Sequence, residues 1–173
     1  MPLVLSTERI GSYRSRATLD ELRTLCPTAL PTLGSGFEGV WAALDVSIGQ
    51  LTILAGQNWR YKAAFDDPQT PEPVPEWERE PSHWIVRGCG AELPSSVSSC
   101  GTWADLTASF GLEGDGSAEF GPVVVHLDAL PGFDFQLDVT YREAGDVEVH
   151  HDLSRIPPTA RIVEIIIVPG GAG

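Results

Sequence analysis

The sequence predicts an α+β fold in which two tandem repeats, each a helix followed by antiparallel strands, form one compact unit. Three observations favour this fold: an ordered internal repeat, two capped helical segments, and short alternating strands. Segments that recur in one order are typical of a duplicated unit, whereas a single short match would carry no weight. The recurring pairs are residues 18–22 with 102–106, 40–45 with 123–128, and 81–86 with 158–163, at offsets of 84, 83 and 77 residues.

A short helix is expected early in each repeat. Thr18 and Thr102 can each accept a hydrogen bond from an N–H group of the first helical turn, which otherwise lacks a partner. Acidic residues follow in the first turn, where they interact favourably with the helix dipole, and Pro27 or Gly111 ends the pattern. The sequence therefore predicts helices that begin directly after the two threonines.

Strands are expected to follow each helix. Residues 40–45 and 123–128 have the character of strands, and turn signals separate them from alternating segments at residues 51–55 and 133–139. Alternation with a period of two predicts one buried face and one face in water. The connections are too short for parallel crossovers, so the strands are expected to be antiparallel.

The length of 173 residues suits one domain of about 150 residues, here divided into repeats at residues 1–90 and 91–173. No apolar run approaches the ~20 residues that cross a bilayer, so a soluble chain that does not span a membrane is expected. The first residues lack the features of a secretory signal. A cytoplasmic location and a periplasmic location, with a signal already removed, both stay open.

The charge distribution points to a binding surface. The net charge is −13, and Lys62 is the sole lysine, so binding to nucleic acid is disfavoured. Residues 66–81 form a proline-rich loop that carries −5 of this charge, and we expect it to dock a basic partner surface. The alternatives are that the loop is merely a solvated surface loop and that the tryptophans Trp59, Trp77 and Trp84 pack in the core. The predicted partner-binding residues are Trp59, Asp66, Asp67, Glu72, Glu76, Trp77, Glu78, Glu80 and Trp84.

No catalytic, metal-binding or cofactor motif stands out in the sequence, and no cofactor is predicted. His126 and Asp128 would share one face of a strand, but no third metal ligand lies within reach along the chain. The alternative to a binding protein is a soluble ligand-binding domain or hydrolase with a pocket between the repeats. His126, Asp128 and Asp45 are the candidate residues for such a pocket.

The three cysteines, Cys26, Cys89 and Cys100, are too few for a disulfide framework and lack the spacing of a zinc site. Cys89 and Cys100 can pair in an oxidising compartment. Free or buried thiols are the alternative.

Residues 17–27 and 156–163 resemble small two-repeat bacterial domains, often exported, with no assigned activity. The chain is also similar, more weakly, to membrane-extrinsic accessory subunits of bacterial photosynthetic reaction centre–light-harvesting complexes. The resemblance implies a non-enzymatic structural subunit that bridges or stabilises a larger assembly. Its partners would be protein subunits of that assembly, including membrane-embedded ones, and its mechanism would be geometric.

Overall fold

The computed structural model describes residues 2–36, 39–45, 48–58, 75–117, 122–140 and 152–170. Its main element is one eight-stranded sheet in which every neighbouring pair of strands is antiparallel. The strand order is β4-β5-β6-β7-β12-β11-β10-β9. The bounds are β4 (Leu30–Gly36), β5 (Gly39–Asp45), β6 (Thr52–Asn58), β7 (His83–Arg87), β9 (Gly114–Ser117), β10 (Pro122–Leu127), β11 (Phe133–Thr140) and β12 (Ile162–Ile167).

The predicted α+β class is wrong, because the fold is mainly β. The described residues contain two short α-helices, α1 (Leu19–Leu25) and α2 (Trp103–Phe110). The strands do not form two separate helix-plus-strand units either: β7 pairs directly with β12. A four-stranded half on its own would leave the N–H and C=O groups of β7 unpaired along one edge, and pairing with β12 removes that edge.

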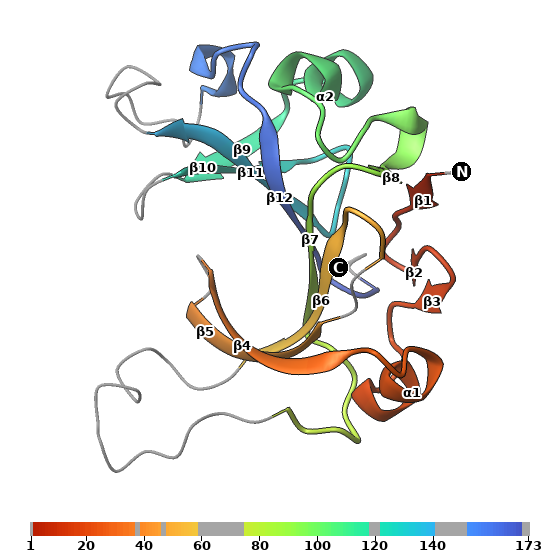
Figure 1. The fold of residues 1–173 in the computed structure, drawn as a ribbon. Helices are drawn as coiled ribbons and strands as arrows, with labels where there is room; N and C mark the ends of the chain where they lie inside the picture. Colours follow the sequence, from red (N-terminus) through yellow and green to blue (C-terminus); the bar gives the residue numbers. More distant parts are fainter. Residues whose placement is uncertain are drawn as a thin grey trace.

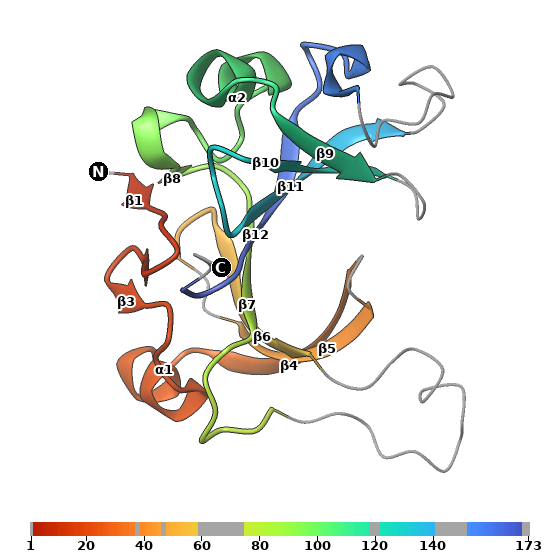
Figure 2. The same ribbon diagram turned by 180° about the vertical axis from the view of Figure 1, so that it is seen from behind.

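The sheet is strongly bent. Figure 1 shows β4–β6 at the bottom, β7 and β12 rising through the middle, and β9–β11 at the top. In both Figure 1 and Figure 2 the two helices lie on the outer side of the bend, with the N-terminal strands between them. Those strands are β1 (Leu3–Val4), which pairs in parallel with β8 (Ala91–Glu92), and the hairpin of β2 (Arg9–Ile10) and β3 (Tyr13–Arg14).

The main hydrophobic core lies between the sheet and this outer layer. Alternate residues of the central strands, such as Trp84 on β7 and Ile165 on β12, point into it. Leu5 and Ile10 of the N-terminal segment and Leu22 of α1 cover the same face. The segment before α1 is therefore part of the core, because its apolar side chains are buried against the sheet.

The opposite face of the sheet carries a smaller cluster of Leu54, Ile85 and Ile166. Next to it, Arg87 Nε lies 2.6 Å from Glu164 Oε2, an ion pair that joins β7 to β12. The Glu164 side chain is only 7% exposed. The two halves of the sheet are thus joined by backbone hydrogen bonds and by an ion pair whose carboxylate is buried and whose guanidinium group is partly exposed.

The prediction of two capped helices is confirmed. In α1, the hydroxyl of Thr18 accepts a hydrogen bond from the N–H of Glu21, and Glu21 accepts one in return from the N–H of Thr18. Thr102 and Asp105 form the same reciprocal box at the start of α2. Each box satisfies N–H groups that a helix leaves without partners at its start.

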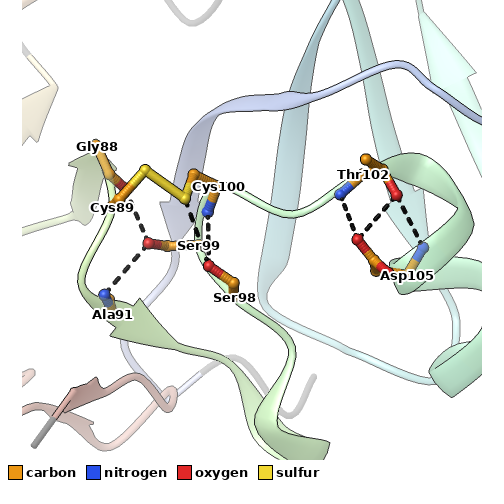
Figure 3. Close-up of a disulfide and its surroundings, with 8 residues drawn as sticks. All are labelled: Gly88, Cys89, Ala91, Ser98, Ser99, Cys100, Thr102 and Asp105. Atoms are coloured by element: carbon orange, nitrogen blue, oxygen red, sulfur yellow. Dashed lines mark hydrogen bonds between the residues drawn. A yellow bond between two sulfur atoms is a disulfide. The ribbon is translucent and has the colours of Figure 1, made fainter.

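The structure joins Cys89 to Cys100 in a disulfide, with the two Cα atoms 5.1 Å apart. Ser99 lies beside it, and its hydroxyl donates to the carbonyl of Gly88 at 2.8 Å. Figure 3 shows how this link and the Thr102–Asp105 box follow one another on the way into α2. The disulfide thus closes the loop of β8 directly before the second helix.

Among the described residues, no helix is both long enough and apolar enough to cross a bilayer.

Candidate functional site

The side chain of Gln57, on β6, holds the chain at Glu76. The Gln57 amide oxygen accepts from the N–H of Glu76 at 2.7 Å, and the amide nitrogen donates to the carbonyl of Glu76 at 2.9 Å. Gln57 is itself buried. Because both backbone groups of Glu76 are paired with one buried side chain, the part of the predicted loop that precedes β7 is held against β6.

Helix α1 fixes the same segment from the other side. The N–H of Leu19 donates to the carbonyl of Arg79 at 3.1 Å, and the N–H of Asp20 donates to the carbonyl of Trp77 at 2.9 Å. First-turn N–H groups of a helix have no partner within the helix, so these carbonyls complete the cap.

The second half repeats this arrangement. The N–H of Trp103 donates to the carbonyl of Ala160 at 2.7 Å, and that of Ala104 donates to the carbonyl of Pro158 at 3.0 Å. Residues 158–160 therefore cap α2, and strand β12 begins only at Ile162. The predicted match of residues 81–86 with 158–163 is misplaced. Residues 158–160 cap α2 and precede β12, whereas residues 83–86 already belong to β7.

Trp77 is half-buried and packs against the main core. The guanidinium carbon of Arg23, on α1, lies 4.4 Å from the centre of its ring. A cation at this distance is attracted to the face of an indole ring. The exposed part of Trp77 is thus held between the core and an arginine.

Carboxylates surround this tryptophan. Glu76 pairs with Arg79 at 2.7 Å, and Asp20 pairs with Arg23 at 2.8 Å. Glu78 and Glu80 are exposed and form no ion pair with any other residue in the described ranges. We call Asp20, Glu76, Trp77, Glu78 and Glu80 the acidic platform. A pocket of about 580 Å³ lies on it, lined by Asp20, Arg23 and residues 75–79.

The structure brings together part of the predicted partner-binding set. Glu76, Trp77 and Glu78 line the pocket, and Glu80 lies on the same segment. The remaining loop residues, Trp59, Asp66, Asp67 and Glu72, lie outside the described residues.

Trp84 is a correction to the predicted set. Its side chain is 0% exposed, and its indole N–H donates to the carbonyl of Ser15 at 2.8 Å. The position alternates inward on β7, so the ring packs in the core and a partner could not reach it.

Sequence reasoning missed Gln57 and Arg23. Gln57 lies about twenty positions before the chain it holds, and no local pattern marks that contact. Arg23 could have been found, since it follows Asp20 by three positions on a predicted helix and such residues are neighbours on the helix surface.

The residues of the alternative pocket do not come together as predicted. His126 Nδ1 lies 3.1 Å from Asp134 Oδ1 on the neighbouring strand β11, and Asp128 lies past the end of β10. Asp45 belongs to β5, and four strands separate β5 from β10 in the sheet. Burial raises the pKa of Asp134, although the hydrogen bond from His126 opposes that change. Within the described ranges, no three His, Cys, Asp or Glu side chains gather as metal ligands would.

Comparison with known proteins gives a likeness of fold alone. No protein-family model matches the chain, and no curated protein sequence does. Among solved structures, the crystal structure of the uncharacterized protein yfeY from Escherichia coli is similar, with a TM-score of 0.51 and 10% sequence identity. The match covers 97% of this chain and 99% of that chain. The likeness is one of overall fold and extends over nearly the whole of both chains.

Proposed function

We propose that this protein is a non-enzymatic interaction subunit that docks a basic surface of a partner protein on the acidic platform. The observation that carries the proposal is the fixed position of Trp77, which is held by α1 and stacked under Arg23. A tryptophan that is already ordered loses little conformational entropy on binding. Tryptophan and arginine are also the residue types that contribute most to protein interfaces.

Charge favours a basic partner. Glu78 and Glu80 are exposed and unpaired within the described part of the chain, so their negative charges face solvent and can attract a cationic surface. Complementary charge at the rim of an interface speeds association and selects partners. Membership of a photosynthetic assembly, which the sequence resemblance implies, stays a prediction.

A site-specific crosslink tests this function. A photoreactive benzoylphenylalanine replaces Glu80 in the source cells, and the matched control carries it at Ser109, an exposed position on α2. We expect one discrete adduct with a basic protein from position 80 and none from position 109. Adding Glu78→Lys, or raising the salt concentration, should abolish the adduct, because both remove the attraction.

Two results would reject the proposal. One is an adduct of equal yield from Ser109, which would show that the platform is not the contact. The other is an adduct that survives both Glu78→Lys and high salt, which would show that the charge of the platform does not recruit the partner.

A hydrolase is the second candidate, and one observation favours it. A carboxylate that holds a histidine ring, as Asp134 does for His126 at 3.1 Å, is the usual support of a general base. In an ester hydrolysis assay, this candidate predicts that His126→Ala abolishes turnover and that Asp128→Ala preserves it. Wild-type protein without turnover above the buffer rate would reject it.

A further inference from the structure

A second pocket lies beside the N-terminal hairpin, apart from the acidic platform. Its volume is about 550 Å³, and its lining comes from residues 7–9, residues 14–16 and Gly170. The lining includes three arginines, Arg9, Arg14 and Arg16, and one acid, Glu8. We call it the arginine pocket. It concentrates three of the eleven basic residues of a chain whose net charge is −13.

Arg16 has no acidic partner. It forms no hydrogen bond or ion pair with any residue of the described ranges, although acids outnumber bases two to one in the chain. Its guanidinium group lies so close to Gly170 that a Cβ atom at that position would collide with it. Arg16 is exposed, so its positive charge stands at the pocket and no described acid neutralises it.

The other two arginines are only weakly engaged. Arg9 Nη2 donates to the carbonyl of Ser12 at 2.9 Å, which leaves its charge uncompensated. Arg14 approaches Glu21 at 3.3 Å, and both side chains are largely exposed. Exposed pairs of this kind contribute little free energy, so Arg14 can turn toward a ligand at small cost.

The floor of the pocket is rigid. Ser15 is buried, and its hydroxyl donates to the carbonyl of Thr7 at 2.6 Å, while its carbonyl accepts from the indole of Trp84. The N–H of Gly170 donates to the same Thr7 carbonyl at 3.0 Å. The backbone segments that carry the three exposed arginines are thus tied to each other and to the central sheet, so little backbone order has to be gained when a ligand binds.

We propose that the arginine pocket binds the phosphate group of a phosphate monoester. Three guanidinium groups and one carboxylate give its lining a net charge of plus two, which matches the dianion that such a group forms near neutral pH. Guanidinium forks suit phosphate oxygens, because each can donate two parallel hydrogen bonds. The volume exceeds that of a phosphate alone and leaves room for the organic part of the ligand.

A soluble metabolite and a lipid headgroup can both present this chemistry, so the experiment has two arms. Calorimetry at low salt measures binding of glycerol 3-phosphate, with glycerol and succinate as comparison ligands. Flotation measures binding to phosphatidylcholine vesicles with and without phosphatidic acid. We expect glycerol 3-phosphate to bind with a stoichiometry of one and more tightly than succinate. If the natural phosphate monoester is a lipid headgroup, we also expect binding to the vesicles that contain phosphatidic acid.

Variants separate the pocket from general charge effects. Arg16→Gln and Arg9→Gln should each weaken binding by about tenfold or more, the effect of one charge-assisted hydrogen bond. Glu8→Gln should strengthen binding, because it removes a like charge from the lining. Arg155→Gln is the matched control, since Arg155 is exposed and paired with Asp152. Circular dichroism verifies that each variant is folded.

Binding in either arm that depends on Arg16 supports the proposal and identifies the source of the phosphate. Three results overturn it: no binding of either probe at millimolar ligand, equal losses in Arg16→Gln and Arg155→Gln, or tighter binding of succinate than of glycerol 3-phosphate. These outcomes are independent of the acidic platform, whose residues the variants leave unchanged.

Discussion

Trp84 donates its indole N–H to the main-chain carbonyl of Ser15 at 2.8 Å, across 69 positions of the sequence. Trp84 lies at the centre of the sheet on β7, and Ser15 lies in the floor of the arginine pocket. Both residues are buried, so water cannot replace the bond. One hydrogen bond thus couples the packing of the core to the position of the N-terminal segment.

Trp84→Phe tests this coupling. The substitution keeps an aromatic ring but leaves the carbonyl of Ser15 without its donor, so we expect a loss of about 1–3 kcal/mol in the free energy of unfolding, beyond the effect of reduced ring volume. Urea denaturation measures it. The control is Trp103→Phe, since Trp103 is also buried and its indole makes no hydrogen bond to a described residue. Equal losses in both variants would contradict the prediction.

The disulfide should stabilise the fold. Cys89 and Cys100 are separated by 11 residues, and closing a loop of this size stabilises a protein by about 3 kcal/mol. We expect dithiothreitol, or Cys89→Ala with Cys100→Ala, to lower the urea midpoint, while Cys26→Ala leaves it almost unchanged. Thiol titration of denatured protein prepared without reductant should find one reactive group per chain, from Cys26. Three reactive groups would show that the pair is not oxidised in the cell.

His83 should make the fold sensitive to acid. Burial lowers the pKa of His83 from 6.5 to about 4. Below pH 6.5 the unfolded chain takes up a proton that the folded chain refuses until about pH 4. The contribution of neutral His83 to the free energy of unfolding is therefore fully present above pH 6.5. It decreases as the pH falls from 6.5 to about 4, by about 3 kcal/mol in all.

Two measurements check His83. Its ring protons should titrate in NMR spectra with a midpoint near pH 4, and His83→Gln should flatten the pH dependence of unfolding between 4 and 6.5. Gly56→Ala offers a further test, because a Cβ atom there would lie 2.5 Å from His83 Nε2. A midpoint near 6.5 would show that the ring is solvated and not buried.

The cap of α2 should contribute through both of its members. Thr102→Ala removes the acceptor for the Asp105 N–H and should cost about 1 kcal/mol, measured by thermal or urea unfolding. Hydrogen bonds from Thr102 hold the pKa of Asp105 below its usual value. The stabilisation by the Asp105 carboxylate is therefore present above the pKa that Asp105 has in the unfolded chain. It is lost as the pH falls through the lower pKa that Asp105 has in the folded protein. In Thr102→Ala, the carboxyl of Asp105 should titrate at a higher pH in carbon-13 NMR. If the Asp105 carboxyl titrated at the same pH in Thr102→Ala as in the wild type, the hydrogen bonds of this capping box would be contradicted.

Gln57 should control the order of the acidic platform. Gln57→Leu removes both hydrogen bonds to the backbone of Glu76, so the Glu76 amide should exchange with solvent at least about tenfold faster. Hydrogen exchange read by mass spectrometry on residues 75–81 measures this. Gln136→Leu on β11 is a matched control for the loss of an amide on the sheet. Faster exchange in both variants would indicate general destabilisation.

Local patterns gave the elements that depend on near neighbours. The capping threonines Thr18 and Thr102 were predicted and are confirmed, because a cap needs only a side chain and the next three residues. Alternation at residues 133–139 likewise predicted a strand that the structure shows as β11. Within the candidate site, the composition of the loop pointed to Glu76, Trp77 and Glu78, and these three do line one pocket.

Tertiary structure decided what depends on distant pairs. By itself the sequence determined the charge, the capped helices and the antiparallel alternation, since each follows from residues close together in the chain. The pairing of β7 with β12, which turned the expected α+β repeats into one β-sheet, joins strands nearly 80 positions apart. The same holds for the burial of Trp84 and for the approach of Gly170 to Arg16. Periodicity determines which face of a strand is buried, but only chain folding selects the neighbour against which it is buried.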